Sequence, residues 1–198
     1  KWGNVIVNGI TIIKPSKKIE EDSKIKIIES IKYVSRAGYK LDKALKEFKI
    51  NIKNKICLDI GSSTGGFVDC LLQKGAKKVY ALEIAKGQLH ERLKTDKRVI
   101  NLEGINIKKD FDLPEQIDFC SIDVTFVSIK EVIKNILFKL KKNSDIVALI
   151  KPPFEIPERK LKAVRDIKLQ NKIIDEIVSW SKENNLNVLG VIESPIKG

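Results

Sequence analysis

The chain has 198 residues, 42% of them hydrophobic, which suffices for one full α/β core and a small appendage. No stretch reaches the roughly eighteen apolar residues of a membrane helix, and the first residues lack the layout of a signal peptide, so we expect a cytoplasmic protein with no membrane partner. The net charge of +12 favours nucleic acid as the partner, although a lysine-rich proteome would produce the same excess without that meaning.

Cys57, Cys70 and Cys120 are the cysteines, and they have neither the CxxC spacing of a zinc site nor the even number of a complete disulfide set. We therefore expect buried thiols. The lone His90 is expected on a helix, at the surface or half-buried, and no metal site is predicted. The chain starts at Lys1 and contains no methionine, from which we expect a part of a longer gene product.

Residues 5–13 read VIVNGITII, two β-branched runs joined by Asn8-Gly9, the preferred pair for a two-residue hairpin turn. A further short strand is expected at 25–28. So short a segment cannot form a domain alone, so residues 1–30 are expected to be the last part of an upstream domain with its linker. Residues 31–198 would then form the main domain.

Apolar residues at Leu41, Ala44, Leu45 and Phe48 have helical spacing and predict an amphipathic helix capped by Ser35. Strands are then predicted at 56–60, 79–83, 99–102, 117–122, 146–150 and 188–192. Helices are predicted between them at 64–74, 88–93, 127–140 and 161–183. This alternation indicates a doubly wound α/β fold whose mostly parallel sheet is covered on both faces, with ligands bound beyond the carboxyl ends of the strands.

The first core strand ends in a glycine-rich turn, DIGSSTGGF, over residues 59–67. Glycines let a ligand approach the backbone, and the helix start offers free N–H groups. The turn has neither the GxGxxG of a dinucleotide site nor the GK[ST] of a phosphate loop. The next strand closes at Glu83, whose carboxylate could accept both ribose hydroxyls of a nucleoside. The turn alone would also suit a purely structural role, and Asp59 could simply accept hydrogen bonds from loop amides.

Six segments now become recognisable in order: YVSRAGYKL (33–41), DIGSSTGGFVDCLLQKGA (59–76), ALEIAKGQL (81–89), SIDVTFVSI (121–129), LIKPPFE (149–155) and ESPIKG (193–198). Together they resemble the hemolysin-A-type family of ribosomal RNA methyltransferases, in which an amino-terminal alpha-L RNA-binding domain precedes an FtsJ-like methyltransferase domain. VNGITIIKPSKKI resembles the final hairpin of that RNA-binding domain. The resemblance implies a class I, Rossmann-like fold that transfers methyl from S-adenosylmethionine to a ribose 2'-hydroxyl of ribosomal RNA or ribosomal subunits. It leaves a homodimer open.

The resemblance also implies a Lys-Asp-Lys-Glu tetrad, of which Lys40, Asp123 and Lys151 are present. Its glutamate is expected beyond Gly198 and is not assigned to Glu193. The implied cofactor contacts are Asp59, Gly61, Ser62, Ser63, Thr64, Gly65, Gly66, Phe67, Glu83, Ile84, Asn106 and Asp123. Two positions depart from the family, which usually has Gln at Pro153 and commonly Asp at Glu83.

The chemistry supports these roles independently of the resemblance. A ribose hydroxyl is a very weak acid, so its attack on a sulfonium methyl needs a base within about 3 Å. Lys151 is the expected base, because burial and a second ammonium such as Lys40 both favour the neutral amine. Asp123 is expected to orient Lys151 rather than to make it more basic. Lys40 could also be an ordinary solvated lysine of a helix.

Two other functions are weighed against this one. A non-catalytic RNA-binding assembly factor could keep the fold, but it would not need to keep Lys40, Asp123 and Lys151 together. A pore-forming cytolysin, which the family name suggests, is disfavoured by the lack of a secretion signal, a membrane helix and a long alternating hairpin.

Overall fold

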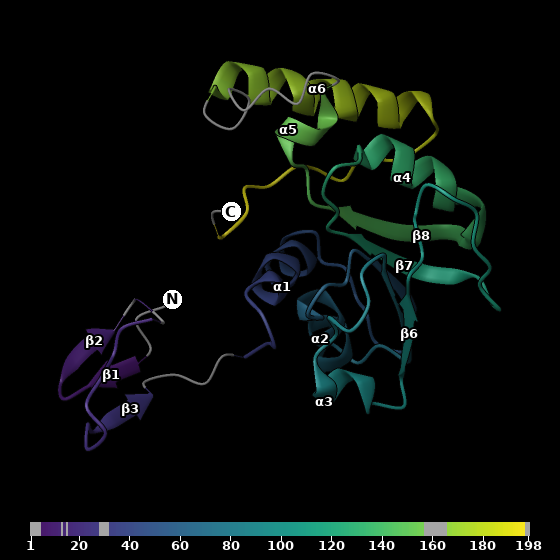
Figure 1. Ribbon diagram of the computed structural model, residues 1–198. Helices are drawn as coiled ribbons and strands as arrows, with labels where there is room; N and C mark the ends of the chain where they lie inside the picture. The colour runs from purple at the N-terminus through teal and green to yellow at the C-terminus, as the bar shows by residue number, and fades with distance from the viewer. Residues whose placement is uncertain (1–4, 13, 15, 28–31, 157–165, 197–198) are drawn as a thin grey trace. The chain divides into compact units, whose positions relative to one another are not determined.

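A computed structural model describes residues 5–12, 14, 16–27, 32–156 and 166–196, which divide into two compact units, Lys1–Lys32 and Tyr33–Gly198. The first unit contains a three-stranded antiparallel sheet in the order β2-β1-β3 (Figure 1). Its strands are β1 (Val5–Val7), β2 (Ile10–Ile12) and β3 (Ile25–Ile27). Asn8 and Gly9 form the turn, both with positive φ, so the hairpin and the third strand are confirmed; Ile13 and Ile28 lie outside the described residues.

The second unit is built on a five-stranded parallel sheet in the order β6-β5-β4-β7-β8 (Figure 1). The strands are β4 (Ile56–Ile60), β5 (Lys78–Glu83), β6 (Val99–Glu103), β7 (Ile117–Ile122) and β8 (Leu140–Ala148). All five residues of β4 are buried, as expected for a central strand covered on both faces. The chain winds outward from β4 in one direction and then in the other, so the order of the strands reverses between β4 and β7.

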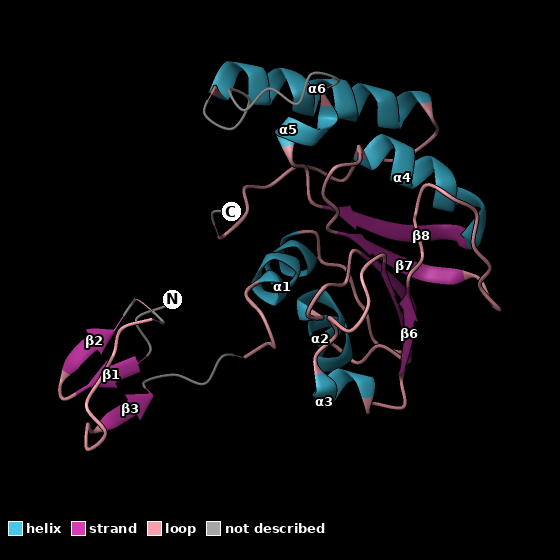
Figure 2. Ribbon diagram, viewed as in Figure 1, coloured by secondary structure: helices cyan, strands magenta, loops and turns pink. Residues whose placement is uncertain are grey.

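Helices cover both faces of this sheet, which confirms the doubly wound α/β fold (Figure 2). On one face lie α1 (Ala37–Glu47), α2 (Gly66–Gln73) and α3 (Glu91–Lys94). On the other lie α4 (Ile129–Ile136), the 3-10 helix η1 (Leu137–Lys139) and α6 (Ile167–Glu183), with the short α5 (Pro152–Glu155) after β8. A separate apolar cluster fills each side, and the three cysteines are buried free thiols, as predicted.

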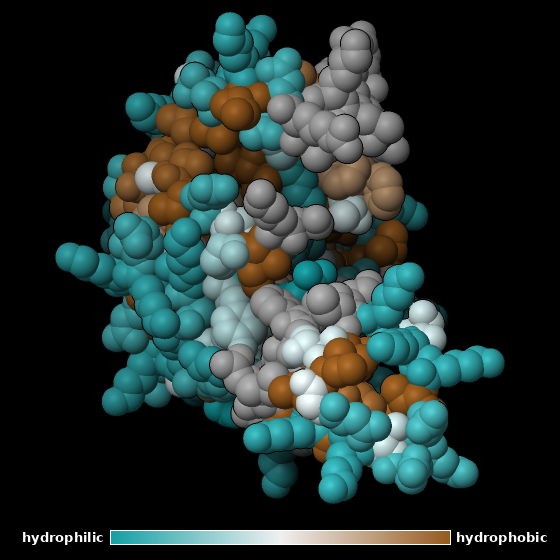
Figure 3. Space-filling model, turned by 90° about the vertical axis from the view of Figure 1, so that its left-hand side faces the viewer, coloured by the Kyte–Doolittle hydropathy of each residue, from teal (hydrophilic) through white to brown (hydrophobic). Residues whose placement is uncertain are grey.

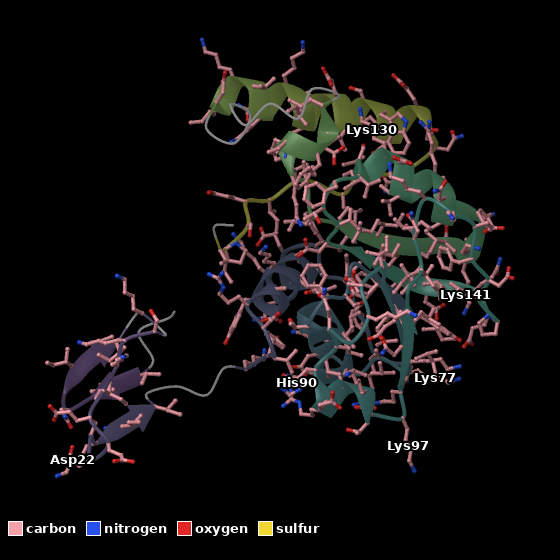
Figure 4. All side chains as sticks on the ribbon, viewed as in Figure 1. Asp22, Lys77, His90, Lys97, Lys130 and Lys141 are labelled. Atoms are coloured by element: carbon pink, nitrogen blue, oxygen red, sulfur yellow. The ribbon has the colours of Figure 1, made fainter. Side chains whose placement is uncertain are left out.

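Several helix boundaries differ from the prediction. Arg36, not Ser35, is the N-cap residue of α1, and its side chain makes no capping hydrogen bond. The helix predicted at 88–93 is a single turn, and His90 precedes it as its N-cap. The His90 side chain is exposed (Figure 4), and its Nδ1 atom accepts a hydrogen bond from the Arg92 amide at 3.2 Å. The prediction that His90 lies within a helix was therefore wrong: its backbone is extended, and its side chain caps the helix that follows.

The far edge of the sheet also differs. β8 begins at Leu140, earlier than predicted, because an irregular register lets the chain pair with β7 directly after η1. The strand predicted at 188–192 does not form. A cavity of about 540 Å³ lies between β8 and residues 185–191, so their backbones do not come together to form a ladder. The helix predicted at 161–183 begins among residues 161–165, which lie outside the described residues. The described part starts at Asp166, which caps α6.

Candidate functional site

A pocket of about 660 Å³ opens at the carboxyl ends of the strands, where the strand order reverses. The loops after β4, β5, β6 and β7 line it, together with Lys151 beyond β8. Nine of the residues predicted from the resemblance to contact a cofactor are in its wall: Gly61, Ser62, Ser63, Thr64, Phe67, Glu83, Ile84, Asn106 and Asp123. Asp59, Gly65 and Gly66 are not among the residues that line it, so their cofactor contacts remain predictions.

The glycine-rich turn has its shape because three of its residues have positive φ: Gly61, Ser63 and Gly65. Gly65 is the left-handed N-cap of α2, and its amide donates to the carbonyl of Ser62 at 2.7 Å. A Cβ atom at Gly61 would lie 2.4 Å from the carbonyl oxygen of Asp123. Gly61 therefore lets the turn after β4 lie directly against the residue that follows β7.

Gly66 has a similar role on the other side of the turn. A Cβ atom there would lie 2.2 Å from the Ser35 hydroxyl and 2.9 Å from the Ala37 side chain. Ser35 and Ala37 both line the pocket, although sequence analysis did not assign them to it. Glycine at this position thus allows the segment before α1 to form one wall.

Glu83 ends β5 and is held by backbone amides. Its Oε2 atom accepts from Ser63 N at 2.9 Å, and Oε1 accepts from Ala85 N at 3.1 Å. Each carboxylate oxygen retains a lone pair for a further donor. The arrangement fixes a carboxylate at the edge of the pocket, as the prediction of a ribose-binding acid requires.

Asp59 lies below the pocket and is almost fully buried. Its Oδ1 atom accepts from Ser121 Oγ at 2.6 Å, whereas Oδ2 has no hydrogen-bond partner within the described part of the chain. Burial raises the pKa of Asp59 from an ordinary value of 3.8 to about 7, and the charges of Asp123 and Glu83 add to the rise, against the Ser121 hydrogen bond.

This raised pKa makes the stability of the fold depend on pH. The folded protein holds the Asp59 proton more tightly than the unfolded chain does. The contribution of protonated Asp59 to the free energy of unfolding is therefore complete below about pH 4 and is lost as the pH rises through about 7. Asp59→Asn removes this loss, worth at most about 4 kcal/mol. We expect the unfolding free energy of Asp59→Asn, measured in urea, to improve relative to the original chain between pH 5 and pH 8. A difference that stays constant over this range would contradict the assignment.

Asp123 and Lys151 form an ion pair in the pocket wall, with Lys151 Nζ 2.6 Å from Asp123 Oδ1. The side chain of Lys151 is 25% exposed and that of Asp123 is 17% exposed, so both can still reach a bound molecule. Asp123 N donates to Ile60 O at 2.9 Å, which fixes the backbone of Asp123 against β4. Pro152 then opens α5, so Lys151 is held between a strand and a helix start.

Lys40 is placed differently from the other two members of the predicted tetrad. It lies half-buried on α1, outside the pocket lining, and has no ion-pair partner among the residues described. One turn along α1, Lys43 Nζ donates to the carbonyl of Glu193 at 2.9 Å, which ties residues near the end of the described chain to α1. The structure thus brings Asp123 and Lys151 together, while Lys40 remains a prediction.

Two aromatic side chains that sequence analysis did not assign lie near the ion pair. Phe126 and Phe154 have ring centroids 5.1 Å apart, each three residues beyond a member of the pair. Phe126 has 64% of its surface exposed, a positive φ of 66°, and lines the pocket. A positive φ strains the backbone of a large side chain, and such strain is typical of functional positions.

Asp69 is a second residue that sequence analysis missed. Its side chain is 5% exposed and accepts from Val34 N at 2.8 Å, Arg92 at 2.7 Å and Gln73 at 3.0 Å. It therefore ties the segment before α1 and the helix α3 to α2. Only the charge of Asp69 within the apolar run of α2 could have indicated this role.

Comparisons with known proteins agree with this geometry. Residues 33–198 match the FtsJ-like methyltransferase family. The chain is 42% identical to hemolysin A of Brachyspira hyodysenteriae, across 99% of this chain and 84% of that protein. It is 30% identical to the 16S/23S rRNA (cytidine-2'-O)-methyltransferase TlyA of Mycobacterium tuberculosis, across 99% and 76%. A crystal structure of a provisionally named hemolysin from Lactococcus lactis is 41% identical, with a TM-score of 0.81 over 85% of this chain and 84% of that chain.

Proposed function

The chain belongs to the FtsJ-like methyltransferase family, and we propose that it transfers a methyl group from S-adenosylmethionine to a ribose 2'-hydroxyl of ribosomal RNA. The observation that carries this proposal is the Lys151–Asp123 ion pair in the wall of a pocket that also contains the Glu83 carboxylate. The substrate class is supported by the mycobacterial relative, which is named for 2'-O-methylation of cytidine in 16S and 23S rRNA.

The residues present suit S-adenosylmethionine. Glu83 offers a fixed carboxylate for ribose hydroxyls, and Gly61 lets the turn after β4 lie directly against Asp123, so that both form part of the pocket wall. Oδ2 of Asp59, which has no hydrogen-bond partner among the residues that the structure describes, adds a polar atom just below the turn. When bound, S-adenosylmethionine supplies a methyl group on a positively charged sulfur. Asn106, in the wall after β6, is the proposed contact for the adenine.

Lys151 is the proposed base. In its neutral form, the amine would accept the proton of the ribose hydroxyl as the oxygen bonds to the methyl carbon and the carbon–sulfur bond of the cofactor breaks, leaving a neutral thioether. Asp123 would hold the amine in position at 2.6 Å. Asp123 is itself fixed by Ile60 and by the close approach of Gly61. Lys40 is proposed to act from α1 once RNA is bound.

The surface suits a polyanionic partner. The net charge is +12, and hydrophilic side chains predominate on the face drawn in Figure 3, many of them projecting outward. None of the helices in the described ranges combines the length and apolar character needed to span a membrane. We place the enzyme in the cytoplasm with the ribosome, and residues 1–30 as the last part of an RNA-binding domain.

Phe126 is proposed to stack on a base of the RNA near the methylated ribose, because exposed aromatics hold unpaired bases by their faces. Phe126→Ala should raise the KM for RNA by about fivefold to a hundredfold, since such stacking contributes about 1–3 kcal/mol. Phe138→Ala, which removes an equally exposed phenylalanine from η1, should leave the KM unchanged. Equal effects of the two substitutions would count against a stacking role.

The proposal is tested by incubating the purified protein with S-adenosylmethionine carrying a tritiated methyl group and with ribosomal subunits or naked rRNA. Tritium is expected in the RNA in proportion to enzyme and time. RNA that binds tightly but gains no methyl group would instead favour a non-catalytic assembly factor. That alternative has less support, because the Asp123–Lys151 pair is intact.

A further inference from the structure

Two loops carry the proposed catalytic pair, and they touch at three successive points. We call residues 123–128 the Asp123 loop and residues 149–155 the Lys151 loop. The contacts are the ion pair of Asp123 with Lys151, the ring contact of Phe126 with Phe154, and two hydrogen bonds accepted by Glu155. The Glu155 hydrogen bonds are therefore the last of three contacts between the loops, and the ion pair of the proposed catalytic residues is the first.

Both carboxylate oxygens of Glu155 accept a hydrogen bond at the start of α4. Oε2 accepts from Ser128 Oγ at 2.6 Å, and Oε1 accepts from Ile129 N at 3.0 Å. Ser128 is the N-cap of α4, and its hydroxyl oxygen also accepts from Lys130 N at 3.2 Å. One carboxylate thus satisfies a free amide at the start of α4 and holds the capping hydroxyl in place.

The location of this contact makes it strong for its size. Charged acceptors form shorter and stronger hydrogen bonds than neutral ones, and a negative charge at a helix N-terminus is further stabilised by the helix dipole. Glu155 is the last residue of α5, so the Lys151 loop adds to the cap that Ser128 provides at the start of α4. Separating the loops would leave the cap incomplete.

We infer that Glu155 is a positioning residue that holds Lys151 at the correct distance from Asp123 by fastening its loop to the start of α4. This inference rests on the proposed function. Pro152 and Pro153 stiffen the four steps between Lys151 and Glu155, so a displacement of Glu155 is passed on to Lys151. A displacement of about 1 Å is enough to slow a reaction by up to about a hundredfold.

The test compares Glu155→Ala with the isosteric Glu155→Gln. Alanine removes both contacts, so kcat should fall by about tenfold to a hundredfold, while the KM for S-adenosylmethionine changes less than about twofold. Glutamine can still accept from Ile129 N and donate to Ser128 Oγ, so it should restore most of kcat. The control is Asp166→Ala, which removes a capping carboxylate from α6 that accepts from Leu169 N at 3.1 Å. It should lower thermal stability comparably without lowering kcat.

A double-mutant cycle with Ser128→Ala tests the contact itself. If Glu155 acts through Ser128, the double variant should lose little more activity than Glu155→Ala alone. Full activity of Glu155→Ala, or independent losses that multiply, would overturn the inference.

Hydrogen exchange separates this inference from the proposed function. Exchange in the Lys151 loop should rise in Glu155→Ala and not in Asp166→Ala, whether or not the protein methylates RNA. If the original chain is inactive and the two variants still show this exchange pattern, the proposed function is refuted while the positioning role of Glu155 is supported. If the enzyme is active and exchange in Glu155→Ala is unchanged, only the positioning role is refuted.

Discussion

Lys151→Ala is expected to lower the rate of methyl transfer to ribosomal RNA by about 10²–10⁴-fold, the usual contribution of a positioned base. Lys151 is the basic side chain that contacts Asp123 in the pocket wall, at 2.6 Å, so its removal leaves the hydroxyl without an acceptor for its proton. Lys151→Arg should be nearly as damaging, because a guanidinium keeps the charge but cannot accept a proton. The rate is measured at saturating S-adenosylmethionine and RNA, with cofactor affinity determined separately by calorimetry.

Lys141→Ala provides the matched control. Lys141 forms a similar ion pair with Asp118 at 2.7 Å, but on the part of the sheet away from the pocket (Figure 4). This variant should retain the full rate, because Lys141 does not line the pocket and because the loss of a surface ion pair changes stability little. Lys151→Ala or Lys151→Arg with more than about a tenth of the original rate would exclude Lys151 as the base.

Gly61→Ala is expected to abolish cofactor binding and methyl transfer together. The new Cβ would lie 2.4 Å from the Asp123 carbonyl oxygen, in a residue whose φ is +81°. Backbone cannot yield as a flexible side chain can, so the turn after β4 must move away from Asp123. The expected loss of unfolding free energy is well above the roughly 1 kcal/mol of left-handed strain alone. Calorimetry with S-adenosylmethionine and urea unfolding measure the two effects.

Gly87→Ala separates strain from collision. Gly87 has a φ of +73°, but apart from its chain neighbours no atom of the described residues lies within 4 Å of where its Cβ would be. This substitution should cost only the conformational strain and should leave cofactor affinity within a few-fold. Similar losses in both variants would mean that the approach of Gly61 to Asp123 has no special role.

The sequence was most informative where function and fold depend on local pattern. The apolar runs predicted the five parallel strands, and DIGSSTGGF predicted the turn that lines the pocket. Asn8-Gly9 predicted its hairpin because few residue pairs accept positive φ at both positions. These features are fixed by neighbouring residues, so no knowledge of distant contacts was needed.

Features that depend on distant partners could not be predicted. Residues 188–192 have the composition of a strand, but a strand also needs an adjacent backbone, and a cavity lies between them and β8. The roles of Asp69 and Glu155 depend on hydrogen bonds to residues 35 and 27 positions away. No sequence spacing indicates such pairs. The pairing of Asp123 with Lys151 was anticipated from the resemblance and from the chemistry of the two residues, and the strand order explains it, because β7 and β8 are neighbours.

The chemical position of the transferred methyl group tests the proposed 2'-O-methylation most directly. After incubation with the enzyme and S-adenosylmethionine, ribosomal RNA is digested to nucleosides and the methylated product is identified by mass spectrometry against standards. The expected product is a nucleoside methylated on its ribose 2'-oxygen, and its yield should fall at least about a hundredfold when Lys151→Ala replaces the original enzyme. A methyl group on a base, or an equal yield from the variant, would contradict the proposed function.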